Sequence, residues 1–169
     1  MPNAVKTYVR YVDAVNRVVG RFAMYLIFAM MGILLYSSIT KTFFIPPLWT
    51  LEMAQFIMVA YYLLGGAYSM QLEGHVRMDL IYGSCSTRRK AWLDAFTVIF
   101  LIIYLGFLLY GGFSSTQYAL KYGERSYSSW QPYMAPIKLI ACAGIFLMLL
   151  QSIASLIKDI ATIRGEEIT

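Results

Sequence analysis

The stretch AFTVIFLIIYLGFLLYGGFSSTQYAL, residues 95–120, runs for 26 residues without a formally charged side chain. A helix needs roughly 20 apolar residues to cross the hydrocarbon core of a bilayer. We therefore predict that this stretch is a transmembrane helix. Its surplus length predicts that the helix is tilted or projects beyond the bilayer.

Three further apolar blocks lie at residues 22–39, 51–70 and 139–157, and Glu52 is the one formally charged residue within them. Over the whole chain, 59% of residues are hydrophobic and 14% are charged, whereas soluble domains average about 25% charged residues. The sequence predicts an all-α integral membrane protein. We expect one domain over 1–169, with transmembrane helices at about 18–40, 51–70, 95–120 and 136–158.

The net charge of +5 is unevenly distributed, and most of the 14 lysines and arginines fall on one predicted side of the membrane. That side carries Lys6, Arg10, Arg17, Arg21, Arg77, Arg88, Arg89, Lys90, Lys158 and Arg164. The other side carries Lys41, Lys121, Arg125 and Lys138. Cytoplasmic loops are enriched in lysine and arginine, so both termini and the 71–94 segment are predicted to be cytoplasmic. The basicity thus indicates topology, and we expect no nucleic-acid partner.

Residues 4–21 form a basic amphipathic segment. Its polar stripe, at helical spacing, consists of Lys6, Arg10, Asp13, Arg17 and Arg21. Such a segment suits the headgroup zone, where cations meet the phosphates of membrane lipid. It is equally consistent with a cytoplasmic extension of the first transmembrane helix, and the sequence leaves both interpretations open.

The second apolar block opens with Trp49, Thr50 and Glu52, after two prolines that stop any helix. Thr50 is a natural N-cap. Glu52 falls in the first turn, where the helix dipole favours an anion. It has a second interpretation, because a carboxylate at the edge of a membrane span usually has a partner. That partner is expected to be a cation on another subunit.

The long polar interval contains Gly74-His75-Val76-Arg77-Met78-Asp79, and then Arg88 and Arg89 at the start of the next helix. Arg77 and Asp79 alternate with apolar residues, so an extended backbone would point both to one side. His75 is the sole histidine, which favours an interfacial residue over a haem or metal ligand. We expect no metal, no cofactor, no catalytic set and no substrate site in this chain. Gln151, an amide inside the last block, is predicted to hydrogen-bond across helices.

Several function classes fit poorly. A transporter that works alone usually has broken helices and repeated halves around a midplane site, whereas these blocks look continuous and unrepeated. A small exporter is expected to carry an acidic residue in mid-membrane. A haem-binding anchor of a redox complex needs more histidines. A helper subunit that packs on a larger membrane protein fits best, with the redox anchor and the self-sufficient exporter as alternatives.

The chain resembles the small membrane subunit, the DctQ-like component, of tripartite ATP-independent periplasmic (TRAP) transporters. The resemblance covers about residues 15–160 and rests on several short motifs. They are Trp49-x-x-Glu52, Gly74-His75-Val76-Arg77-Met78-Asp79, Arg88-Arg89 with Asp94, and Pro136 with Gly144 and Gln151. Lys138 departs from members that have a Gly-rich apolar segment there.

The resemblance implies a bacterial inner-membrane complex of three proteins. A large multi-span subunit carries the substrate and sodium sites, and a periplasmic binding protein delivers an organic acid. The small subunit supports the large one and has no chemistry of its own. The resemblance therefore makes a set of residues candidates for partner contact or for fixing the fold. They are Trp49, Glu52, His75, Arg77, Asp79, Arg88 and Arg89.

Overall fold

The computed structural model describes residues 3–45, 47–72 and 87–164, and these residues form four helices. They are α1 (Asn3–Phe43), α2 (Thr50–Gln71), α4 (Thr87–Tyr122) and α5 (Ala135–Arg164). Among the described residues the sole β feature is an isolated bridge between Arg125 and Tyr133. The all-helical prediction is confirmed, and each predicted apolar block lies within one helix.

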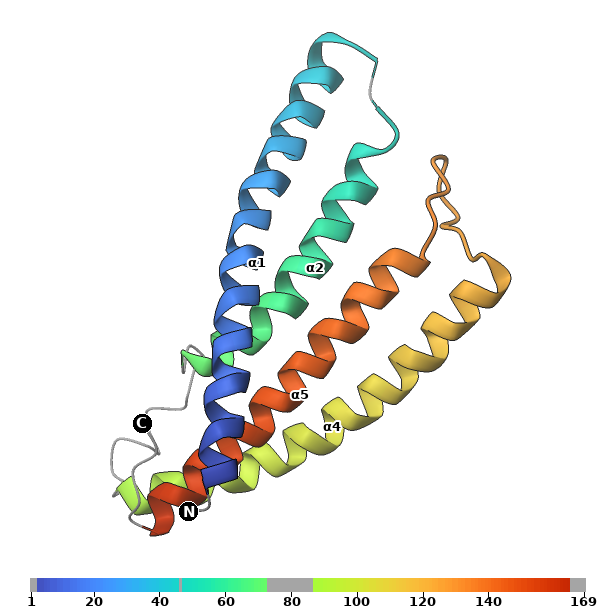
Figure 1. Cartoon of the computed structure of the whole chain (residues 1–169). Helices are drawn as coiled ribbons and strands as arrows, with labels where there is room; N and C mark the ends of the chain where they lie inside the picture. Colours follow the sequence, from blue (N-terminus) through green and yellow to red (C-terminus); the bar gives the residue numbers. More distant parts are fainter. Residues whose placement is uncertain (1–2, 46, 73–86, 165–169) are drawn as a thin grey trace.

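The helices form two hairpins that meet at one end and diverge toward the other (Figure 1). The first hairpin pairs α1 with α2, and the second pairs α4 with α5. Between the hairpins, α2 packs on α5, and α1 reaches α5 only near the end where α1 begins. The molecule is therefore V-shaped, with its vertex at the end that holds the start of α1 and the end of α5.

α1 is continuous over 41 residues, about 60 Å at a rise of about 1.5 Å per residue. The hydrocarbon core of a bilayer is only about 30 Å thick, so α1 is about twice as long as a perpendicular span needs to be. The basic segment at 4–21 is thus continuous with the first apolar block in a single helix. Where this segment lies relative to the lipid headgroups stays a prediction.

Three of the described helices contain segments long and apolar enough to cross a membrane: Val5–Phe43, Trp92–Tyr122 and Ala135–Ile163. α2 is not among them, although it has 22 residues. Its apolar character is diluted by Glu52, Gln55 and three tyrosines. The structure therefore shows a membrane protein with three candidate spans, and the count of four stays a prediction. The 36 residues of α4 agree with the predicted surplus length of that span.

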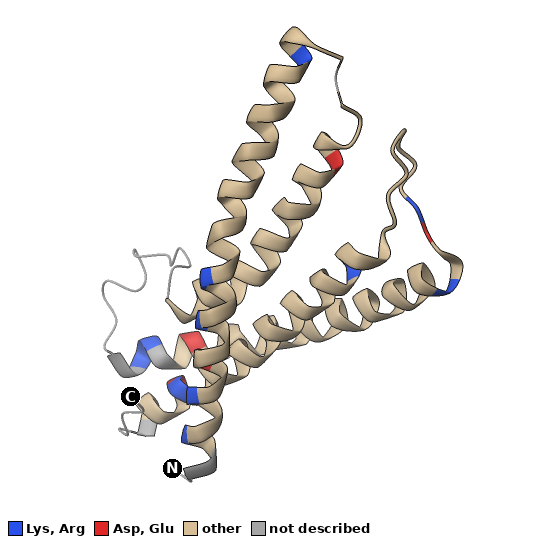
Figure 2. Cartoon of the chain, turned by 45° about the horizontal axis from the view of Figure 1, so that its top comes forward, with Lys and Arg blue, Asp and Glu red and all other residues tan. Residues whose placement is uncertain are grey.

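Charged residues lie toward the two ends of the molecule, and the second half of α1 before Lys41 and the middles of α2, α4 and α5 carry none (Figure 2). The vertex carries the basic residues of early α1 and early α4 together with Lys158. The tips carry Lys41, Lys121, Arg125 and Lys138. The described members of the two groups that the sequence assigns to opposite membrane sides thus lie at opposite ends. Which end faces the cytoplasm stays a prediction of the charge rule.

The contact between the hairpins depends on small residues. A Cβ atom added to Gly144 of α5 would lie 2.8 Å from the backbone carbonyl carbon of Leu63 on α2. One turn further, a Cβ at Gly66 would lie 2.9 Å from the sulfur of Met148. Small residues allow such close approach of helices in lipid, where packing drives association. The Gly144 contact therefore fixes how closely the two hairpins meet.

Candidate functional site

Four polar side chains at the vertex, Asp13, Asn16, Gln151 and Lys158, form one connected network between α1 and α5. Asp13 accepts a hydrogen bond from Nε2 of Gln151 at 3.0 Å, and it forms an ion pair with Nζ of Lys158 at 2.7 Å. Oε1 of Gln151 in turn accepts from Nδ2 of Asn16 at 2.6 Å. Asn16 is 1% exposed and Gln151 is fully buried. The prediction that Gln151 hydrogen-bonds across helices is confirmed.

The network lies beside a small apolar core of the same helices. Val9 and Val12 of α1 pack against Ala154 of α5, and Leu150 and Ile157 cover them. The hydroxyl of Tyr8 donates to the carbonyl oxygen of Leu150 at 3.3 Å. α1 therefore turns an apolar stripe and a polar stripe toward α5 at once, and exposes its basic residues on the remaining side.

The chemistry available in this network is structural. The negative charge of Asp13 is balanced by Lys158, and both side chains remain partly exposed, at 20% and 35%. Among the described residues, no group of three or more histidine, cysteine, aspartate or glutamate side chains is arranged to hold a metal ion. The network therefore serves to hold α1 against α5, two helices that are far apart in the sequence.

At the tip of the first hairpin, Trp49 and Thr50 hold α2 against α1. The ring of Trp49 stacks on Tyr36 at a centroid distance of 6.0 Å. The hydroxyl of Thr50 is buried, 3.0 Å from that of Ser37, and donates to the carbonyl oxygen of Pro47 at 3.2 Å. The predicted N-cap role of Thr50 is wrong. Trp49 is the N-cap residue, so the Thr50 hydroxyl is used between helices instead.

Glu52 lies half-buried in the first turn of α2 and has no counter-ion among the described residues. Its Oε2 atom is buried and accepts no hydrogen bond from them. Glu52 shares a stripe of α2 with Leu63 and Gly66, which contact α5 further down. At the level of Glu52, however, the hairpins have diverged (Figure 1). The carboxylate thus lies on the inner side of the V.

The other predicted residues lie in or beside the polar interval. His75, Arg77 and Asp79 fall outside the described residues. Arg88 belongs to the first turn of α4, where only its backbone is described, and the side chain of Arg89 is exposed. The structure therefore brings together Trp49 and Glu52 at the tip, and places Arg89 at the vertex end.

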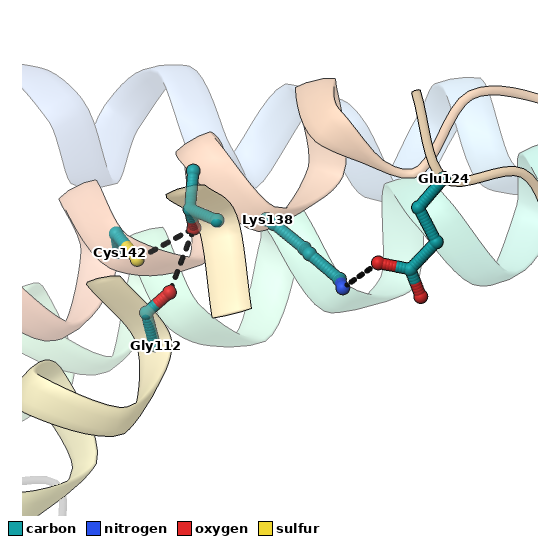
Figure 3. A network of polar contacts seen from close by, with 5 residues as sticks. Gly112, Glu124, Lys138 and Cys142 are labelled. Carbon is teal, nitrogen blue, oxygen red and sulfur yellow. Dashed lines mark hydrogen bonds and ion pairs between the residues drawn. The ribbon is translucent and has the colours of Figure 1, made fainter. Parts of the chain in front are cut away.

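The second hairpin is closed near its tip by two polar contacts (Figure 3). Lys138 of α5 pairs with Glu124 in the loop that follows α4. One turn below, the hydroxyl of Thr116 lies 3.3 Å from the sulfur of Cys142 and donates to the carbonyl oxygen of Gly112 at 2.8 Å. Lys138, which departs from the resembled pattern, therefore has a structural role within the chain.

A shallow pocket opens on the outward face of α4, lined by Ile103, Gly106, Phe107 and Tyr110. Its lining is apolar apart from the tyrosine hydroxyl, so it offers no cation to an organic acid. Such a surface fits acyl chains or the apolar face of another membrane helix.

The polar network that Asp13, Asn16 and Lys158 form with Gln151 was not predicted from the sequence. The sequence pattern places Asp13 on the exposed basic stripe of α1, whereas it faces α5 through the network. One signal was available, because Asn16 is a polar residue on the valine-rich face of that helix. It lies one turn from Asp13 and pointed to a polar partner on a neighbouring helix.

Comparison with protein-family models gives a match over residues 30–162 to the family described as "Tripartite ATP-independent periplasmic transporters, DctQ component". No curated protein and no solved structure matches the chain. The match includes residues of all four helices, from the last third of α1 to the last turn of α5. It confirms the resemblance carried by the short motifs. The chain therefore belongs to the DctQ family, the small membrane subunits of tripartite ATP-independent periplasmic transporters.

Proposed function

We propose that this chain supports a large multi-span membrane subunit in the sodium-coupled uptake of an organic acid, which a periplasmic binding protein delivers. The family match carries the proposal. It favours a transporter subunit over the redox anchor and the self-sufficient exporter that the sequence left open. In this function the bacterial inner membrane holds the complex, sodium binds to the large subunit, and the present chain is neither an enzyme nor a substrate carrier.

The form of the molecule supports a scaffolding role. Its long helices are fixed to one another at the vertex by buried contacts, and the surfaces of α1 and α4 remain largely uncovered by the rest of the chain. The pocket on α4 is apolar, and the carboxylate of Asp13 is already paired. A rigid body with apolar outer faces suits a static support in lipid.

Affinity purification of the full chain from its native membrane tests this function. Mass spectrometry should identify a large polytopic membrane protein that co-purifies with it. Reconstituted alone, the chain should give no uptake of organic acids under a sodium gradient, and uptake should require the large subunit and the binding protein. Recovery of this chain with no large partner, or uptake by this chain alone, would contradict the proposal.

Within that complex, we propose that the carboxylate of Glu52 binds a lysine or arginine of the large subunit. The buried Oε2 atom of this half-buried residue lacks a donor among the described residues, and this supports the contact. Trp49, which is 37% exposed at the same tip, is the neighbouring contact. His75, Arg77, Asp79, Arg88 and Arg89 are proposed to serve the same partner, or the fold, at the cytoplasmic end.

Glu52→Gln tests this contact, with Glu124→Gln as the matched control. Removing one member of a hydrogen-bonded charge pair at an interface costs about 2–5 kcal/mol, so the Glu52 variant should bind the large subunit at least about tenfold more weakly. Its thermal stability as an isolated chain should not fall. The control breaks the ion pair with Lys138 inside the chain, so it should lower stability slightly and leave binding unchanged. Equal binding by the two variants would rule out the proposed contact.

A further inference from the structure

The vertex brings α1, α2 and α5 together at one level. Ser152 of α5 donates a weak hydrogen bond to the sulfur of Met70 on α2, at 3.9 Å. The adjacent residue of α5, Gln151, bonds Asn16 of α1. On the α1–α2 side, a Cβ added to Gly20 would overlap the side chain of Tyr68. α1 and α2 run antiparallel, so one helical turn back from Gly20 toward the start of α1 corresponds to one turn forward from Tyr68. Asn16 therefore lies level with the last residues of α2.

The end of α2 places the side chain of Gln71 toward this junction. Gln71 follows Ala60 and Ala67 at intervals that put all three on one face of the helix. Both alanines are buried, at 7% and 1% exposure. This face lies between the face that contacts α1 and the face that contacts α5. Gln71 therefore extends the buried strip into the place where Asn16 and Gln151 meet.

The orientation of two amides in the junction is set by Asp13. A carboxylate only accepts hydrogen bonds, so Gln151 must turn Nε2 toward Asp13 and Oε1 toward Asn16. Asn16 must then turn Nδ2 toward Gln151. This leaves Oδ1 of Asn16 as a buried acceptor, and the described residues supply no donor to it. Flipping the Gln151 amide would place its Oε1 against the Asp13 carboxylate, and flipping the Asn16 amide would place its Oδ1 against Gln151 Oε1. Both flips are therefore excluded.

The helical face of Gln71 directs a second buried acceptor, also without a donor among the described residues, toward the same junction. It is Oε1 of Gln71, on a different helix. Buried polar atoms in native proteins are almost always hydrogen-bonded, to protein or to ordered water. Two such oxygens near one level of a three-helix junction need a donor that the described residues do not supply.

We propose that the junction binds an internal water molecule, which donates one hydrogen to Asn16 Oδ1 and the other to Gln71 Oε1. Water supplies two donors, the number that the two oxygens need, and internal waters typically make two to four hydrogen bonds in polar sites. A neutral molecule also matches the charge. Asp13 is balanced by Lys158, so a cation would add an uncompensated positive charge. The water would join α2 to the network of α1 and α5.

Gln71→Met in the full chain tests the water, with Gln55→Met as the control. Both changes replace an amide of α2 by a thioether, and Gln55 is exposed. If water links Gln71 to Asn16, the first variant should lower the melting temperature in detergent by about 2–4 °C, the shift expected for one lost hydrogen bond. The control should change it by less than about 1 °C. An unchanged or raised melting temperature for Gln71→Met would overturn the proposal, because removing an unbonded buried acceptor relieves a cost.

Two further measurements distinguish a bound water from a bound cation and from two unlinked amides. In an Asn16→Leu background, Gln71→Met should cost less than it does alone, because the water has already lost one acceptor. An equal cost in both backgrounds would show that the residues are not linked. The melting temperature should be the same in sodium chloride and choline chloride, and a stabilisation that requires sodium would assign the site to a cation instead. These readouts use the isolated chain, so they are independent of any transport activity.

Discussion

At the vertex, the hydrogen bonds between α1 and α5 join residues 135 or more positions apart in the chain, as between Asn16 and Gln151. At the tips, the polar contacts stay within one hairpin, with separations of 13 for Ser37–Thr50 and 14 for Glu124–Lys138. The vertex therefore holds the two hairpins together, whereas each tip only closes its own hairpin. The tips can be perturbed without separating the hairpins, and the vertex cannot.

The largest expected effect comes from breaking the vertex network at its centre. Gln151→Leu removes the partner of the buried Nδ2 of Asn16 and of Oδ1 of the partly exposed Asp13, and an unsatisfied buried group costs about 1–3 kcal/mol. We expect a loss of about 2–4 kcal/mol of unfolding free energy, measured by denaturant titration in mixed micelles. Gln117→Leu, an exposed position of α4, is the control and should be nearly neutral. Comparable losses in the two variants would mean that the network does not hold the vertex.

The next effect tests the close approach of α2 and α5. Gly144→Ala adds a Cβ 2.8 Å from the Leu63 backbone, so it should destabilise the chain by about 1–3 kcal/mol, as overpacking does. Gly106→Ala is the control, because a Cβ there meets nothing within 4 Å. It should stabilise by up to about 1 kcal/mol through helix propensity. Thermal unfolding of the purified chain measures both, and effects of the same sign would argue against the packing described.

The smallest effect compares the two ion pairs. Lys158→Met breaks the pair with Asp13 at the vertex, and Lys138→Met breaks the pair with Glu124 at a tip. Both pairs are partly solvated, so each is worth no more than about 1 kcal/mol. The vertex variant should lose more, because Asp13 also orients Gln151. Melting temperatures at low and high salt measure the difference, and an equal or larger loss for the tip variant would contradict it.

The helices themselves were readable from the sequence, because uncharged runs of bilayer length leave the backbone little alternative to a helix. The cross-helix hydrogen bond of Gln151 was predictable for the same reason, since an amide in an apolar span needs a partner. Its partner was not predictable. Asn16 lies 135 positions away, and only the packing of α1 on α5 brings it near.

For other features, the sequence is consistent with two alternative structures and does not distinguish between them. The basic segment of α1 suits a lipid surface and a projecting helix equally well, and its continuity with the span was decided in the structure. Threonine is a residue type that often caps helices, but the side chain of Thr50 contacts the hydroxyl of Ser37 on α1 instead. The V shape arises because α2 and α5 touch at Gly144 and part beyond it. A pattern of small residues does not reveal where such a contact begins.

The long sequence separation between the paired residues of the vertex also affects when they can pair during synthesis of the chain. Ribosomes add about 5–20 residues per second, so the 135 residues between Asn16 and Gln151 take roughly 7–27 s to synthesise at that rate. During that interval α1 and α2 can already close as a hairpin through Ser37 and Thr50. Asp13 and Asn16, however, must wait for α5. The nascent first hairpin therefore exposes an unpaired carboxylate and amide until the last helix arrives, and membrane quality-control proteases have that period in which to recognise an unfinished chain.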